Sequence, residues 1–169
     1  CLPEQHGFDI NIGGGHYGGP GPNGYFAPYP LIKMPPAEPG TYLTDQVTDE
    51  AIRLIRNRAD RPFFLNLSHY AVHTPIQAPA PLVEKYRAKA SALGLDRVDP
   101  FVEGERHPCL HKKHLHVKRR TLQSDITYAA MIENLDTNIG RLLDALEAEG
   151  LMQNTLVVFT SDNGGLSTS

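Results

Sequence analysis

The sequence lacks several features that would assign a chain to a class at once. It has only two cysteines, Cys1 and Cys109, which are too few to assign a redox compartment. No apolar run approaches the roughly 20 residues of a membrane-spanning helix. A net charge of −3 argues against a general nucleic-acid binder. The glycines form no GxxxxGK(S/T) pattern, so no phosphate-binding loop of that type is predicted.

What is present is the composition of an ordinary globular domain. The 169 residues are 40% hydrophobic and 21% charged, enough for one domain with a real core. The chain opens with a cysteine and with Gly-rich, polar sequence. We therefore expect an internal piece of a longer protein, whose targeting segment would lie elsewhere.

Three segments are expected to be helical. Apolar residues recur at three-to-four spacing over 44–57 and, most regularly, over 125–149. A shorter helix is expected over 79–90, where a proline near the start costs little. Thr44 and Ser124 are the expected N-caps of the first and the longest helix.

Two apolar segments, 63–68 and 155–160, have the composition of buried strands, and 8–12 is a third, shorter candidate. The helix over 125–149 lies between the first two, as in a crossover of a parallel or mixed sheet. The sequence thus predicts an α/β fold. Parallel strands would place both carboxyl ends at one edge of the sheet, where ligands bind in open α/β folds.

Polar residues follow both predicted strands. His69 and His73 come after the first, and Asp162 and Asn163 directly after the second. Carboxylate and amide oxygens are ligands of hard cations such as Ca²⁺. Asp-Asn-Gly-Gly is also ordinary turn sequence, and taken alone it favours a plain turn. Convergence of the two loops at one sheet edge favours a site.

Four segments together resemble the sulfatases of the alkaline phosphatase superfamily. They are Gly7-Phe8-Asp9, Arg61-Pro62-Phe63-Phe64-Leu65 leading to His69 and His73-Thr74-Pro75, the helical segment from Tyr128 to Leu143, and Thr160-Ser161-Asp162-Asn163-Gly164-Gly165. The resemblance implies a three-layer α/β sandwich with a mixed, mostly parallel sheet. Residues 1–169 would be part of its catalytic domain. We expect a Gly/Pro-rich loop region (1–42), helix–strand–helix (43–90), an irregular basic and His-rich insertion (91–123), and helix–strand–metal loop (124–169).

The resemblance also implies roles for single residues. Asp162 and Asn163 would be ligands of a divalent cation, usually Ca²⁺. His73 would be the catalytic histidine, as a ligand of the sulfate group or as the acid for the leaving oxygen. His69 is a second candidate for substrate binding, although it matches a family position less well. The alternative for each histidine is a loop residue that caps backbone groups.

The family's nucleophile is absent. Sulfatases use a formylglycine made from the Cys or Ser of a C/S-x-P-x-R motif, and Cys1-Leu2-Pro3-Glu4-Gln5 has glutamine in place of the arginine. We expect the formylglycine and the remainder of the catalytic domain to come from sequence outside this chain, and the 169 residues alone to be inactive. The resemblance also implies a secreted, periplasmic or lysosomal-type compartment.

A basic stretch rich in histidine occupies 107–120. Its His and Cys spacing matches no common zinc-ligand pattern, so a solvated surface segment is favoured. If this stretch lies beside the ligand-binding edge of the sheet, its cations would contact a polyanion such as a sulfated polysaccharide. These cations are Lys112, Lys113, Lys118, Arg119 and Arg120.

Two other functions stay open at this stage. One is a phosphodiesterase or phosphonate hydrolase of the same superfamily, and the other is a non-catalytic relative that binds a sulfated glycan. The nucleophile segment would decide between these and a sulfatase that cleaves sulfate monoesters.

Overall fold

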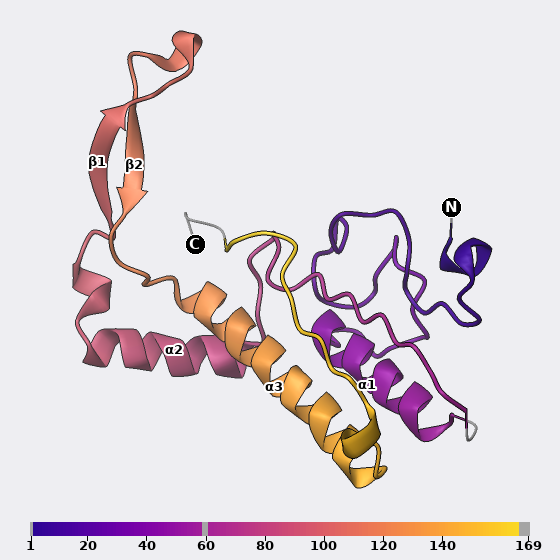
Figure 1. Cartoon of the computed structure of the whole chain (residues 1–169). Helices are drawn as coiled ribbons and strands as arrows, with labels where there is room; N and C mark the ends of the chain where they lie inside the picture. The colour runs from indigo at the N-terminus through magenta and orange to yellow at the C-terminus, as the bar shows by residue number, and fades with distance from the viewer. Residues whose placement is uncertain (1, 59–60, 166–169) are drawn as a thin grey trace.

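The computed structural model describes residues 2–58 and 61–165, which form three α-helices and one small sheet (Figure 1). The helices are α1 (Leu43–Arg56), α2 (Ala80–Ala92) and α3 (Ile126–Ala148), and the antiparallel strands are β1 (Phe101–Arg106) and β2 (His116–Arg120). Short 3₁₀ helices are η1 (Pro3–His6), η2 (Leu95–Arg97), η3 (Leu110–Lys112) and η4 (Met152–Asn154). All three predicted helices are confirmed, each within two residues.

The core lies where α1 and α2 pack against α3 and where the N-terminal loop region folds over them. Its buried members come from all of these parts and are Tyr25, Ile32, Tyr42, Leu43, Ala78, Ala130 and Met131. None of the helices in the described part of the chain is both long and apolar enough to cross a bilayer.

Both predicted N-caps are wrong. Asp125 caps α3, because its Oδ1 accepts hydrogen bonds from the backbone nitrogens of Thr127 (2.9 Å) and Tyr128 (2.8 Å). The first turn of α1 has no side-chain cap. Its Leu43 nitrogen donates instead to the backbone oxygen of Tyr25 at 2.8 Å, so Thr44 is free to enter the core, where it is 2% exposed. The backbone oxygen of Tyr25, distant in sequence, thus takes the place of a side-chain cap.

The predicted strands at 63–68, 155–160 and 8–12 pair with no other strand in the described residues. The first two are extended, but a strand also needs a neighbour that takes its backbone hydrogen bonds, and residues 2–58 and 61–165 supply none. Their apolar side chains are correspondingly uncovered: Phe64 is 80% exposed, Leu156 89% and Phe159 74%. The fold is mixed α/β as predicted, whereas the sheet within these residues is a two-stranded hairpin.

The prediction that 91–123 is irregular is wrong for the centre of that segment, where β1 and β2 form this hairpin. Glu103 lies opposite Lys118 in the register, and the guanidinium of Arg119 lies 2.6 Å from the carboxylate of Glu105. Charged residues and glycine are poor strand formers, so strand propensity did not predict this hairpin. Ion pairs across the strands stabilise it instead.

Candidate functional site

His73 lies in the loop that follows the extended segment 63–68. Its ring is exposed, and Nδ1 is 2.8 Å from the backbone oxygen of Thr74. A carbonyl oxygen can only accept, so Nδ1 carries the hydrogen and Nε2 remains available for a ligand. The Gly-rich loop passes beside the ring, since a Cβ on Gly19 would lie 3.6 Å from Nδ1. The peptide bonds Ala71–Val72 and Thr74–Pro75 are both cis.

Two buried tyrosines hold this loop in place. The hydroxyl of Tyr25, which is fully buried, donates to the backbone oxygen of His73 at 2.8 Å, and Tyr42 donates to the backbone oxygen of Gln77 at 2.7 Å. Burial raises the pKa of both tyrosines, so both hydroxyls stay protonated donors at neutral pH. The side-chain oxygen of Gln77 accepts in turn from the Tyr25 nitrogen at 2.9 Å.

Gly24 is required beside this anchor. Its φ is +67°, and a Cβ there would overlap the side chain of Gln77. Tyr25, Gln77 and Gly24 were not among the site residues predicted from the sequence. Their roles come from contacts across about fifty residues of chain, and no local pattern indicates such contacts.

His69 lies in the same loop but in a different environment. Both ring nitrogens are buried and have no hydrogen-bond partner among residues 2–58 and 61–165. Burial lowers the pKa of His69, so the ring is neutral near pH 7. His73 is exposed, whereas His69 is half-buried. A substrate-binding role for His69 stays a prediction.

Asp162 and Asn163 are exposed and contact each other. The side-chain nitrogen of Asn163 donates to Oδ2 of Asp162 at 2.9 Å, and its backbone nitrogen donates to Oδ1 at 2.9 Å. Ser161 donates to the backbone oxygen of Asn163. The amide oxygen of Asn163 accepts no hydrogen bond within the described part of the chain and is therefore free to bind a cation.

This donor set fits part of a Ca²⁺ site. A carboxylate and an amide oxygen are the right types, but Ca²⁺ takes six to eight oxygens, and two residues supply a minority of them. No group of three or more His, Cys, Asp or Glu side chains that could hold a metal occurs among the residues described. The metal role of Asp162 and Asn163 stays a prediction.

The two loops have different neighbours in the fold. Tyr70, Ala71 and Val72 pack against the core cluster that includes Ala130 and Met131. At the other loop, the hydroxyl of Tyr128 lies 2.7 Å from where a Cβ on Gly165 would be. Gly165 therefore lies beside the first turn of α3. Convergence of the His73 ring and the Asp162 carboxylate on one ligand stays a prediction.

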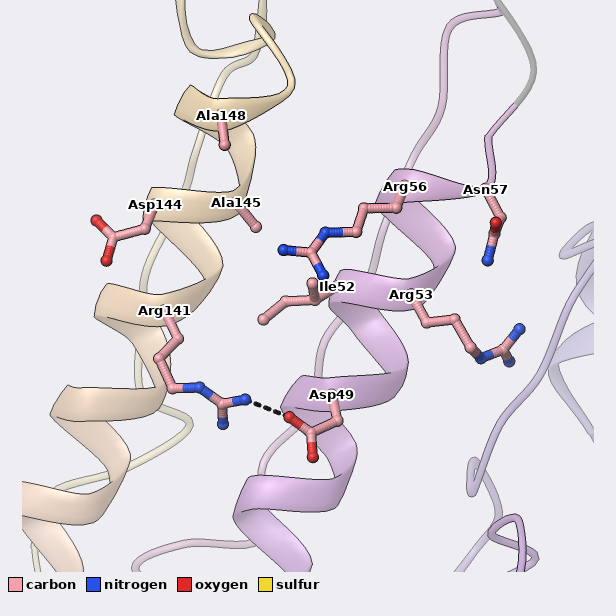
Figure 2. Close-up of a pocket in the computed structure, with 9 residues that line it drawn as sticks. All are labelled: Asp49, Ile52, Arg53, Arg56, Asn57, Arg141, Asp144, Ala145 and Ala148. Carbon is pink, nitrogen blue, oxygen red and sulfur yellow. Dashed lines mark hydrogen bonds and ion pairs between the residues drawn. The ribbon is translucent and has the colours of Figure 1, made fainter.

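A groove of about 620 Å³ lies elsewhere, between α1 and α3 (Figure 2). It contains none of the predicted site residues; its lining is Asp49, Ile52, Arg53, Arg56, Asn57, Arg141, Asp144, Ala145 and Ala148. Each of its three arginines already faces a carboxylate: Arg53 pairs with Glu50, Arg56 with Glu149, and Arg141 with Asp49. We assign this groove to helix packing.

Comparisons with known proteins agree with the resemblance seen in the sequence. The sulfatase family model matches residues 4–168. A protein named sulfatase from Formosa agariphila is 37% identical over 134 residues, which cover 73% of this chain and 19% of that protein. Arylsulfatase J from Mus musculus is 27% identical over 184 aligned positions, covering all of this chain and 25% of that protein.

A third relative broadens the comparison. The multifunctional alkaline phosphatase superfamily protein PehA from Trinickia caryophylli is 28% identical over 134 residues, covering 69% of this chain and 26% of its own length. The chain thus spans about a fifth to a quarter of these relatives. Since the family model covers nearly every residue, the chain belongs to the sulfatase family.

Proposed function

We propose that this chain forms part of an enzyme that hydrolyses sulfate monoesters, with a divalent cation and with a formylglycine nucleophile from outside these 169 residues. Hydrolysis of sulfate esters is the activity for which the sulfatase family is named. The single observation that supports this most is the His73 ring, which is exposed and oriented through Nδ1. Its Nε2 forms no hydrogen bond with residues 2–58 or 61–165.

His73 acts on the sulfate group or on the leaving oxygen. Breaking the S–O bond leaves negative charge on the alkoxide, which needs a proton or a positive partner. With Nδ1–H held by the Thr74 oxygen, a protonated ring presents Nε2–H outward as the donor. The buried tyrosines behind the loop keep this orientation, because they bond its backbone and leave the ring free.

Asp162 and Asn163 hold the cation together with ligands from the rest of the protein. When bound, Ca²⁺ supplies a Lewis acid and a template for the sulfate oxygens. Asp162 contributes a negative charge, and Asn163 contributes a neutral oxygen that leaves the site positive enough for an anion. The chain alone, with two ligands and no nucleophile, is inactive under this proposal.

The extended segments 63–68 and 155–160 belong to the central sheet of the whole domain under this proposal. Their exposed apolar side chains, above all Phe64, Leu156 and Phe159, support it. Neighbouring strands would take the free backbone hydrogen bonds, and helices packed on the faces of the sheet would cover such side chains.

The test uses the whole enzyme that contains this chain, with two sulfate esters that differ in leaving group. If His73 is the acid, His73→Ala should lower kcat about 10²- to 10⁴-fold for an alkyl sulfate. The loss should be much smaller for 4-nitrophenyl sulfate, whose leaving group needs no proton. His111→Ala, an exposed histidine on the hairpin, is the matched control. Equal losses for both esters would assign His73 to sulfate binding, and no loss would refute its role.

A sulfated carbohydrate is the proposed substrate class, in a secreted, periplasmic or lysosomal-type compartment. The second candidate function is a phosphodiesterase or phosphonate hydrolase, favoured by the similarity to a protein named as multifunctional. Turnover of bis(4-nitrophenyl) phosphate above that of 4-nitrophenyl sulfate would select it. A protein that turns over neither ester but binds a sulfated glycan would be the non-catalytic alternative.

A further inference from the structure

The hairpin of β1 and β2, with its connecting tip 107–115, projects away from the helices (Figure 1). Within the part of the chain described, its strands contact each other and no other helix or strand. Apolar side chains along it are open to solvent: Leu110 is 77% exposed, and Val102 and Leu115 are close to half exposed. The hairpin therefore adds little to the core. Its stability must come from contacts within it, and its surface is available to a partner.

Some of its basic side chains make contacts within the hairpin itself. Arg119 pairs with Glu105 at 2.6 Å, and His116 pairs with Glu103 at 3.0 Å. The guanidinium of Arg120 lies 4.6 Å from the centre of the Phe101 ring and donates to the backbone oxygen of Leu122. These three residues are already engaged, so they are poor candidates for binding a ligand.

The cations at and beside the tip are engaged differently. No Asp or Glu occurs from 107 to 118. Lys112, Lys113 and Lys118 are exposed and form no ion pair with any residue that the structure describes. Lys118 lies opposite Glu103 in the register, which partly offsets its charge, whereas Lys112 and Lys113 at η3 have no acid nearby in sequence. The strongest free positive charge of the hairpin is thus at its tip.

The sign and shape of the tip select the partner. In a chain of net charge −3, a protruding pair of lysines concentrates positive potential where a long anion can reach it. Stretch 107–118 has no Phe, Tyr or Trp, the side chains with the largest ring surface for stacking on nucleic-acid bases.

We propose that the hairpin 101–120 is a docking arm for a sulfated polysaccharide, with Lys112 and Lys113 as its main contacts. The identity of the polymer rests on the proposed function, because a sulfatase that acts on polymers needs to hold repeating sulfate groups outside its reaction site. The arm would bind neighbouring sulfates of the polymer, so it would serve polymeric substrates and leave small sulfate esters unaffected.

The test measures binding of a fluorescein-labelled heparin oligosaccharide to the whole protein by anisotropy. Lys112→Ala/Lys113→Ala should raise Kd about five- to tenfold at 50 mM NaCl, and much less at 300 mM, because salt screens exposed charges. Lys33→Ala/Lys89→Ala removes the same charge from exposed sites elsewhere and should change Kd less than about twofold. Charge reversal, Lys112→Glu/Lys113→Glu, should weaken binding further while far-UV circular dichroism stays unchanged.

The outcomes separate the arm from the proposed function. Unchanged heparin binding, or equal effects in the tip and control variants, would overturn the arm even if 4-nitrophenyl sulfate is hydrolysed. A selective loss in the tip variants supports the arm even if no sulfate ester is hydrolysed. Tighter, tip-dependent binding of a single-stranded RNA of equal charge or of phosphatidylglycerol vesicles would overturn the polysaccharide as partner.

Discussion

Asn138 offers the sharpest test of how α1 and α3 are joined. It is 1% exposed, and its side-chain nitrogen donates to Oδ1 of Asp45 on α1 at 2.7 Å. Its side-chain oxygen accepts from Arg141 at 2.8 Å. Asn134, 7% exposed, donates to the same Asp45 oxygen at 2.8 Å. One carboxylate of α1 is thus held by two amides of α3.

Replacing Asn138 by alanine removes two hydrogen bonds to charged groups. Such bonds contribute about 1.5–3 kcal/mol each when well desolvated. Arg141 is exposed and Asp45 keeps its bond from Asn134, so both groups retain other partners. We therefore expect Asn138→Ala to lower the free energy of unfolding by about 2–3 kcal/mol rather than by the full sum.

Urea denaturation of the whole protein, followed by far-UV circular dichroism, measures this loss. Asp136→Ala on the exposed face of α3 is the control and should change stability by less than about 0.5 kcal/mol. A double-mutant cycle with Asp45→Ala should give a coupling energy of about 1–2 kcal/mol. Additive single effects, or a loss for Asn138→Ala no larger than for Asp136→Ala, would refute the proposed link between the helices.

Three further predictions concern the candidate site. Tyr25→Phe removes the bond to the His73 backbone and should cost about 1–2 kcal/mol in a denaturant titration and lower kcat for sulfate esters; unchanged kcat would show that the loop needs no such anchor. Because burial lowers the pKa of His69 below 6.5, the unfolded chain binds a proton more readily than the folded chain. The free energy of unfolding should therefore fall as the pH drops below about 6.5 and level off below the lowered pKa. His69→Phe should flatten this part of the profile of unfolding free energy against pH. Asp162→Ala should weaken Ca²⁺ binding at least about tenfold in calorimetry and make activity dependent on added Ca²⁺; equal affinity would exclude Asp162 as a ligand.

The sequence by itself determined the helices and the family. Apolar residues at helical spacing need only local hydrogen bonds and one buried face, so α1 and α3 could be predicted within two residues. The proline near the start of α2 indicated that helix, also within two residues. The short segments around His73 and Asp162 carried the resemblance that the family model then confirmed. The order of extended segment, histidine loop, helix and oxygen pair likewise follows from the amino-acid pattern alone, because each of these is a local property of the chain.

Only the tertiary structure decided which residues hold one another. The hairpin of β1 and β2 depends on ion pairs across strands, and the loop of His73 on the hydroxyl of Tyr25, 48 positions away in sequence. The cap of α1 could not be predicted because the Tyr25 oxygen takes its place. Such contacts form only when segments distant in sequence meet, so a local sequence pattern does not predict them. Strand pairing obeys the same rule, and for this reason 63–68 and 155–160 are extended here without forming a sheet.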